Sequence, residues 1–292
     1  MTISHMTCAP ATRFLLSVLL LIALFPAGSE ADESNAGTWI PSFAVNTGLR
    51  ALEYDEASVT SARGTFDSEG VRVFGYLGAN VQLMTPVLID RYGKPRLFVR
   101  VGAATSFDQE ERVLNEFAPG QIVIVDPEGA IQGIQGQGSG TGVKTEPPTV
   151  TAGIGLDFAF EVFERRIHVK PSLDWIWEEE RVKTVLGIAE DLGGNPTLCP
   201  CRTAFAHGTN TEPFHGLGPG IELELESGRL GPFMTGIYLH GQAYHVFDRK
   251  VSVRADAVWD DLSGTVSVQS GYERRPWDYR VGVGMRFHWL PD

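Results

Sequence analysis

The chain has 292 residues, with 36 acidic and 24 basic side chains and a formal net charge of −12 at pH 7. Such an acidic surface repels the phosphate backbone, so nucleic acid is excluded as an expected partner. The 33 glycines against 5 methionines fit a sheet protein better than a helical one.

The N-terminus has the features of a secretory signal peptide. Arg13 precedes an apolar run, residues 14–25, and small residues follow as far as Ala31. The run is about 12 residues long, too short to cross a bilayer comfortably as a helix. We therefore expect residues 1–31 to be the signal peptide, and Cys8 to leave with it.

The mature chain contains no second apolar stretch of spanning length. In lipid, only helices and closed barrels satisfy all their backbone hydrogen-bonding groups. The exported chain is therefore expected to be either a soluble periplasmic protein or a membrane barrel.

The clearest strand pattern lies at the C-terminus, over residues 277–289. One face carries only large apolar or aromatic side chains: Trp277, Tyr279, Val281, Val283, Met285, Phe287 and Trp289. Strands of soluble β-sandwiches rarely carry such a face. Strands that contact lipid carry an outward apolar band with aromatic residues at both membrane interfaces. The pattern favours a strand that crosses a membrane.

The same alternation predicts seven more strands. They lie near residues 39–50, 71–85, 96–107, 150–162, 167–177, 212–226 and 233–247. Each is long enough for the 9 to 11 residues of a tilted spanning strand. Long links (53–69, 110–148, 183–210 and 248–275) alternate with short ones near 90–94, 164–166 and 227–229. This alternation is typical of outer-membrane barrels with short periplasmic turns and long extracellular loops.

We therefore predict an all-β fold, an antiparallel transmembrane β-barrel of eight strands over residues 38–290. Ten strands remain an alternative if residues 251–259 and 264–269 form a further spanning hairpin, although we prefer that they extend strands above the membrane. Proline removes a ladder hydrogen bond, so bulges are expected at Pro41, Pro171 and Pro219.

The chain resembles the small eight-stranded outer-membrane barrels of the OmpA, OmpX and OmpW class. The most specific part is the terminal strand, residues 279–289, which looks like the C-terminal signal read by the outer-membrane assembly machinery. The resemblance covers residues 38–290 in pattern and assigns no subfamily. It implies an outer-membrane location, with membrane lipid and the assembly machinery as partners.

Charged residues share the predicted inner face: Arg100, Asp157, Glu161, Lys170, Asp174, Glu222, Glu224, Arg280 and Arg286. An eight-stranded barrel is just wide enough to be filled by side chains, and buried charges must be paired or wet. We interpret the set as a structural ion-pair plug, with a narrow polar conduit as the alternative. Glu222 or Glu224 is the expected partner of Arg286.

Cys199, Cys201, His207 and His215 lie close together in the sequence. They match no standard zinc spacing, and we favour an incidental or disulfide-paired loop over a metal site. No metal or cofactor is expected.

Two further features could in principle take part in catalysis or ligand binding. His245 has outward parity and is a candidate base for a lipid-modifying enzyme, although an interfacial structural role is favoured. The glycine-rich run 131–142 is expected to be a flexible loop, because it lacks the lysine of a phosphate loop.

The sequence thus predicts a non-enzymatic outer-membrane protein with a structural role or a binding role for its long loops, especially 110–148 and 183–210. A small pore for ions or solutes is the alternative, and a lipid-modifying enzyme comes third. The external partner is not identified by any motif.

A fractionation experiment tests the barrel prediction. The protein should be recovered with the outer membrane and should migrate faster on a gel when unheated than when boiled, because a closed barrel resists detergent. Recovery as a soluble periplasmic protein contradicts the prediction.

Overall fold

The computed structural model describes residues 37–61, 64–108, 111–117, 122–125, 131–163, 165–191 and 201–290. The predicted signal peptide and Cys199 lie outside these residues. Within them, no helix is both long and apolar enough to cross a membrane.

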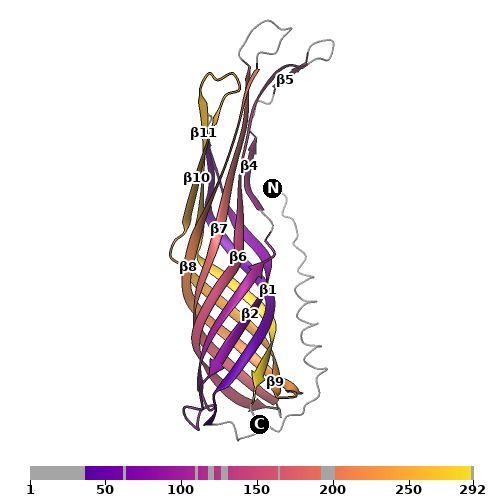
Figure 1. Cartoon of the computed structure of the whole chain (residues 1–292), viewed down its shortest axis with the longest axis vertical. Coiled ribbons are helices and arrows are strands. Elements are labelled where there is room, and N and C mark those ends of the chain that lie inside the picture. The colour runs from indigo at the N-terminus through magenta and orange to yellow at the C-terminus, as the bar shows by residue number, and fades with distance from the viewer. Residues whose placement is uncertain are drawn as a thin grey trace, which may run out of the picture.

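Eight strands form a closed antiparallel ring (Figure 1). They are β1 (Ile40–Ser61), β2 (Gly64–Met84), β3 (Arg96–Ser106), β6 (Ile131–Val162), β7 (Arg165–Asp191), β8 (Cys201–Leu230), β9 (Phe233–Val246) and β11 (Thr265–Trp289). β1 closes the ring by pairing with β11, with Ser42 opposite His288 and Leu49 opposite Val281. The predicted fold class and the count of eight ring strands are therefore confirmed.

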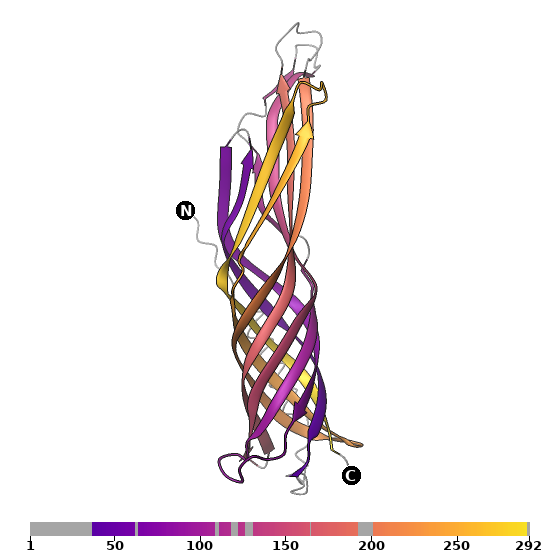
Figure 2. The same cartoon turned by 60° about the vertical axis from the view of Figure 1, so that its left-hand side comes forward.

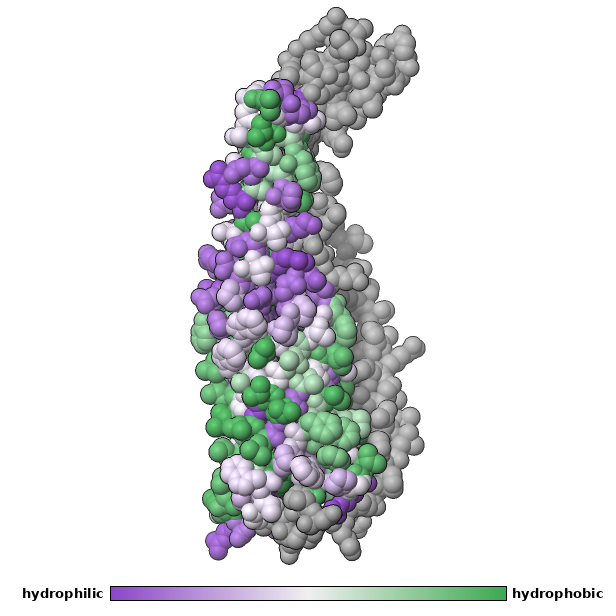
Figure 3. Space-filling model, in the orientation of Figure 1, coloured by the Kyte–Doolittle hydropathy of each residue, from purple (hydrophilic) through white to green (hydrophobic). Residues whose placement is uncertain are grey.

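The outer surface of the ring is an apolar band. Its exposed side chains include Phe43, Val45, Leu49, Val73, Leu77, Val81, Val99, Val101, Ile154, Leu173, Ile221, Leu223, Leu239, Val281 and Met285. Phe43 stacks on Phe287 with ring centroids 4.8 Å apart. In Figure 3 hydrophobic residues gather over the ring, and hydrophilic residues dominate above it. This is the surface that a transmembrane barrel presents to lipid.

The two ends of the ring differ. At the turn end, short links join β2 to β3 (85–95), β6 to β7 (163–164) and β8 to β9 (231–232). At the other end, called the extended end, several strands continue well beyond the ring (Figure 2). β1 starts and β11 finishes at the turn end, since Ile40 pairs with Met84 and the Leu290 amide bonds to Pro232 O.

The extension beyond the ring consists of paired strands. β6, β7 and β8 remain hydrogen-bonded as far as Gly136–Ala189 and Asp191–Cys201. β4 (Glu111–Phe117) and β5 (Ile122–Val125) pair with β6, and β10 (Lys250–Val258) pairs with β11. The expectation that 53–69, 110–148 and 183–210 are loops is therefore wrong for their described parts. In 248–275 the strands agree with the preferred interpretation that this link extends strands beyond the ring.

The reason is that the extension has an apolar core of its own. It is formed by Val59, Leu186, Ile188, Ala204, Ala206, Ala255, Trp259, Val266 and Val268. Burying this surface stabilises strands that no membrane covers. β7 shows the change along a single face: Glu178 and Glu180 point into the ring, and Val182, Leu186 and Ile188 follow on the same side within the extension.

The β10–β11 turn is attached to β8 at the far tip. The Thr203 amide donates to Asp260 Oδ1 at 2.9 Å, and the Asp260 amide donates to Thr203 O at 3.0 Å. The Arg202 guanidinium lies 4.4 Å from the Trp259 ring centroid. These contacts hold the two sides of the extension together.

The preferred interpretation of residues 251–259 and 264–269 is confirmed, because they pair as a hairpin in the extension and add no strand to the ring. The bulges expected at the three prolines are not found. Pro171 and Pro219 leave gaps in the ladders to β6 and β9, without the register shifts expected there. Pro41 likewise pairs in register with Leu83. A missing N–H removes a hydrogen bond, but it does not oblige the strand to gain a residue.

Ring closure can be tested by cross-linking. Val45 lies directly opposite Met285 on β11 and opposite Ala79 on β2. With Cys199 and Cys201 replaced by serine, oxidation should cross-link Val45→Cys with Met285→Cys as readily as Val45→Cys with Ala79→Cys, because direct cross-strand neighbours are within disulfide reach. A cross-link to position 79 but not to 285, read on a non-reducing gel, indicates an open sheet.

Candidate functional site

The interior of the ring is the candidate site, because alternation turns one face of every strand inward. Its cationic side chains are Arg50, Arg72, Arg100, Lys170, Arg274, Arg280 and Arg286. Its carboxylates are Asp108, Asp157, Asp174, Glu178, Glu180, Glu222, Glu224 and Asp278. Such charges are tolerated inside a narrow ring only when they pair.

The layer nearest the turn end is centred on Glu224. Lys170 Nζ donates to Glu224 Oε2 at 2.5 Å, and His288 Nε2 lies 2.5 Å from Glu224 Oε1. His168 Nδ1 lies 2.8 Å from Asp157 Oδ1. β6, β7, β8 and β11 each contribute to this layer, which therefore ties four strands together.

The next layer contains the predicted partner of Arg286. Arg286 Nη2 donates to Glu222 Oε2 at 2.9 Å, and Arg286 also donates to Gln82. Arg100 holds Asp174 with two hydrogen bonds, of 3.0 and 2.7 Å, and reaches Glu222 at 3.3 Å. Glu222 and Glu224 were the two partners expected for Arg286; Glu222 accepts the hydrogen bond, and Glu224 Oε2 lies 3.8 Å from Arg286 Nε. Forked arginine–carboxylate bonds of this kind are strong and directional.

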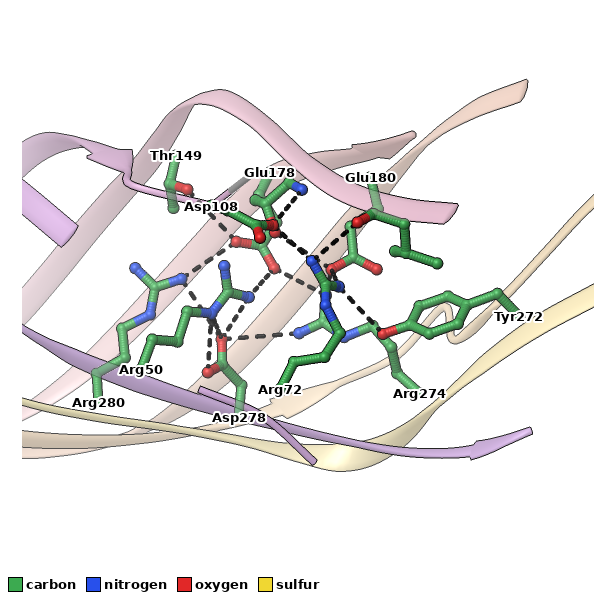
Figure 4. A network of polar contacts seen from close by, with 12 residues as sticks. Arg50, Arg72, Asp108, Thr149, Glu178, Glu180, Tyr272, Arg274, Asp278 and Arg280 are labelled. Atoms are coloured by element: carbon green, nitrogen blue, oxygen red, sulfur yellow. Dashed lines mark hydrogen bonds and ion pairs between the residues drawn. The ribbon is translucent and has the colours of Figure 1, made fainter. Parts of the chain in front are cut away.

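Close to the extended end, Glu178 is the centre of a denser cluster (Figure 4). Arg50 donates to Glu178, while Arg274 Nη1 and Arg280 Nη2 reach it at 2.8 and 3.1 Å. Arg50 Nε also bonds both oxygens of Asp278 at 3.1 Å. We call this set, together with Arg72, Asp108 and Glu180, the upper arginine cluster.

The upper arginine cluster is balanced in charge. Arg72 Nη2 lies 2.5 Å from Asp108 Oδ2, and Arg72 Nη1 lies 3.5 Å from Glu180. The four arginines thus face four carboxylates, Asp108, Glu178, Glu180 and Asp278. Arg50 and Arg72 also lie over the ring of Phe74, at 5.3 and 5.5 Å from its centroid. These cation–π contacts account for an aromatic residue on the inner face of β2.

Apolar side chains continue directly above this cluster. Arg274 lies 5.0 Å from the ring centroid of Phe214. Phe214 belongs to a buried group with Tyr54, Ala57, Val143, Val182, Val246, Val251, Val253 and Tyr272. The ionic interior of the ring therefore passes without a break into the apolar interior of the extension.

A small polar chamber lies between the two arginine layers. Its volume is about 40 Å³, and Asn46, Tyr76, Asn80, Tyr238, His240 and Gln242 are among its lining residues. Tyr76 Oη and His240 Nε2 are 2.6 Å apart. A space of this size holds on the order of three water molecules, so it adds polarity without making a wide channel.

Eight of the nine predicted interior charges belong to this network. Glu161 does not, because it is exposed in the last residues of β6, where the strand projects beyond the ring. The prediction missed the upper arginine cluster apart from Arg280. Inward parity on β7 continues from Asp174 to Glu178 and Glu180, and that signal was available in the sequence.

The described parts of the cysteine and histidine segment lie on or near the outer face of β8. His215 stacks on Trp175 with centroids 5.9 Å apart, and His207 lies 6.1 Å from Phe205. The side chain of Cys201, like Cys199, is outside the described residues. Among the described residues, no group of three or more His, Cys, Asp or Glu side chains is arranged to hold a metal ion.

The two other candidate features, His245 and the run 131–142, also make ordinary structural contacts. His245 makes an edge contact with Trp277, with centroids 5.3 Å apart. The run 131–142 is the first part of β6 and pairs with β7 from Gly136–Ala189 to Gly142–Lys183, so the flexible-loop expectation is wrong. A ladder needs only backbone groups, and glycine supplies them.

Comparison with known proteins gives no family assignment. No protein-family model and no curated protein matches the chain. Among solved structures, the outer membrane protein OprG from Pseudomonas aeruginosa is 9% identical, with 86% of this chain and 98% of that chain covered and a TM-score of 0.28. The outer membrane protease OmpT from Escherichia coli is 8% identical, with 89% and 100% covered and a TM-score of 0.18. These scores carry no argument, and the fold assignment stands on the strand ring itself.

Breaking one pair of the network should be costly. Arg286→Ala leaves Glu222 short of a buried partner, and we expect a loss of about 3 to 5 kcal/mol in unfolding free energy. Combining it with Glu222→Gln should recover part of that loss, because the unpaired charge is removed. Urea titration of the folded band on a gel measures both.

Arg275→Ala is the matched control. Arg275 is exposed and pairs with Glu53 and Asp55 at the surface, so its loss should hardly move the midpoint. If Arg286→Ala behaves like this control, the interior charges are solvated and not a plug.

Proposed function

We propose that this protein is a non-enzymatic outer-membrane barrel whose plugged ring anchors an extension that serves as a structural or binding surface outside the cell. The observation that supports the proposal is the sequence of paired charges and apolar side chains that fills the interior on either side of the small chamber, from the Glu224 layer through the upper arginine cluster into the apolar core of the extension.

Three features support the outer membrane as its location. The N-terminal segment has signal-peptide features, the ring carries an apolar outer band, and residues 279–289 form the last ring strand. That strand is the one offered to the assembly machinery. Short turns belong on the periplasmic side, which directs the extension outward.

The balanced upper cluster argues against the alternative, a small pore. Four buried arginines and four carboxylates close the ring at the level of Glu178, and moving them apart would expose unpaired charges. Among the described residues, the chamber of about 40 Å³ favours the pore. An enzyme remains the third candidate, with His245 in a structural contact with Trp277.

Planar-bilayer recording distinguishes anchor from pore. The purified protein should give no reproducible conductance, because ions have no low-cost path through paired charges and an apolar core. Stable conductance whose ion selectivity reverses in Glu178→Lys overturns the proposal in favour of the pore.

A further inference from the structure

An apolar groove of about 590 Å³ crosses the lipid-facing side of β8, β9, β11, β1 and β2. Small residues, Ala51, Gly241 and Ala243, form part of its lining, and Pro219, Ile221, Tyr279 and Val281 also line it. The register explains the hollow: Gly241 lies between Ile221 on β8 and Val281 on β11, so two large side chains flank a position that has none.

The groove leads into a cluster of rings at its extended end. Two residues beyond Ala243 and Tyr279, on the same face, His245 and Trp277 lie directly opposite each other. Their centroids are 5.3 Å apart at an interplanar angle of 82°, and Phe247 lies 5.8 Å from His245. We call His245, Phe247 and Trp277 the rim patch. All three are exposed.

The chemistry of the rim patch suits a sugar. Flat aromatic faces pack against the C–H groups of a pyranose ring, and an imidazole offers a hydrogen-bond donor or acceptor to hydroxyl groups. An apolar tail and a sugar head would therefore be bound side by side, one in the groove and the other on the rim patch.

The charges beyond the rim patch disfavour an anionic head group. Arg275 pairs with Glu53 and Asp55 at 2.8 and 2.6 Å and lies 4.0 Å from Glu69. Lys250 and Arg249 share Glu273, at 2.8 and 3.7 Å. Four carboxylates thus surround three cations, and a phosphate placed here would meet excess negative charge.

We propose that the groove and the rim patch bind one outer-leaflet glycolipid, with an acyl chain along Gly241 and Ala243 and a sugar against Trp277. This inference rests on the proposed outer-membrane location. The long apolar groove and the uncharged rings together select a glycolipid over a phospholipid of the same chain length.

Native mass spectrometry of the full-length mature protein tests the site. The protein, held in an amine-oxide detergent, receives equal amounts of a diacylglycerol carrying one hexose and phosphatidylglycerol with the same acyl chains. One bound glycolipid should be retained, with a preference of about tenfold, the ratio that 1.4 kcal/mol of head-group contact gives.

Two variants distinguish binding of the acyl chain from recognition of the sugar head group. Gly241→Leu with Ala243→Leu should fill the groove and abolish retention of either lipid, and a Cβ at Gly241 has room, since its nearest neighbour is Ile221 Cγ2 at 4.0 Å. Trp277→Leu should keep lipid retention and lose the preference. Ala103→Leu, outward on β3, and Trp39→Leu, exposed at the turn end, are the controls.

Retention of glycolipid by the filled-groove variant overturns the site, and equal retention of both lipids by the unmodified protein overturns the choice of head group. The heat-dependent gel shift is measured on every sample. A normal shift with failed lipid binding refutes only this inference, whereas recovery of the protein as a soluble form refutes the proposed function.

Discussion

An eight-stranded ring has an interior no wider than the side chains that point into it, and every strand must place half of its residues there. In this protein, charged side chains fill the interior of the ring. Arginine, lysine and carboxylate side chains from strands far apart in the sequence form layers, and Glu178 alone receives Arg50, Arg274 and Arg280. Each layer ties several strands together, so ring closure and ion pairing depend on one another. The outer surface is then free to be apolar, as lipid requires.

The same alternation has the opposite chemistry beyond the membrane. On β7 the inward side chains change from charged to apolar between Glu180 and Val182, which are consecutive residues on that face. Leu186 and Ile188 follow on the same face. Water, in place of lipid, surrounds the extension, so its apolar side chains turn inward. Register shifts near Tyr54 on β1 and between Glu146 and Val150 on β6 lie close to this change. One set of strands thus forms the ring and the extension without a linker between them.

Sequence patterns predicted the ring well, because lipid contact imposes a strict rule on outward residues. The run from Trp277 to Trp289 and the outward side chains Val73, Leu77 and Val81 were read correctly for this reason. The outward apolar residues of the fifth predicted strand stop at Trp177, and the strand was therefore predicted to end there. For this reason Glu178, Glu180 and the extension were missed. Partners across the ring depend on register, which a single sequence does not reveal. The partner of Arg286 was therefore narrowed only to Glu222 or Glu224, because their strands both approach the periplasmic side there, and the register selects Glu222 for the hydrogen bond.

A closed interior of paired charges keeps water-soluble reagents out, so the accessibility of inner-face positions tests the plug directly. Ala104 lines the polar chamber on the inner side of β3, and Thr209 is exposed on β8 in the extension. With Cys199 and Cys201 replaced by serine, single cysteines at positions 104 and 209 can be treated with a membrane-impermeant thiol reagent in the folded protein. We expect rapid modification at 209 and none at 104 until the protein is unfolded. Modification of both positions at similar rates in the folded protein would contradict this expectation.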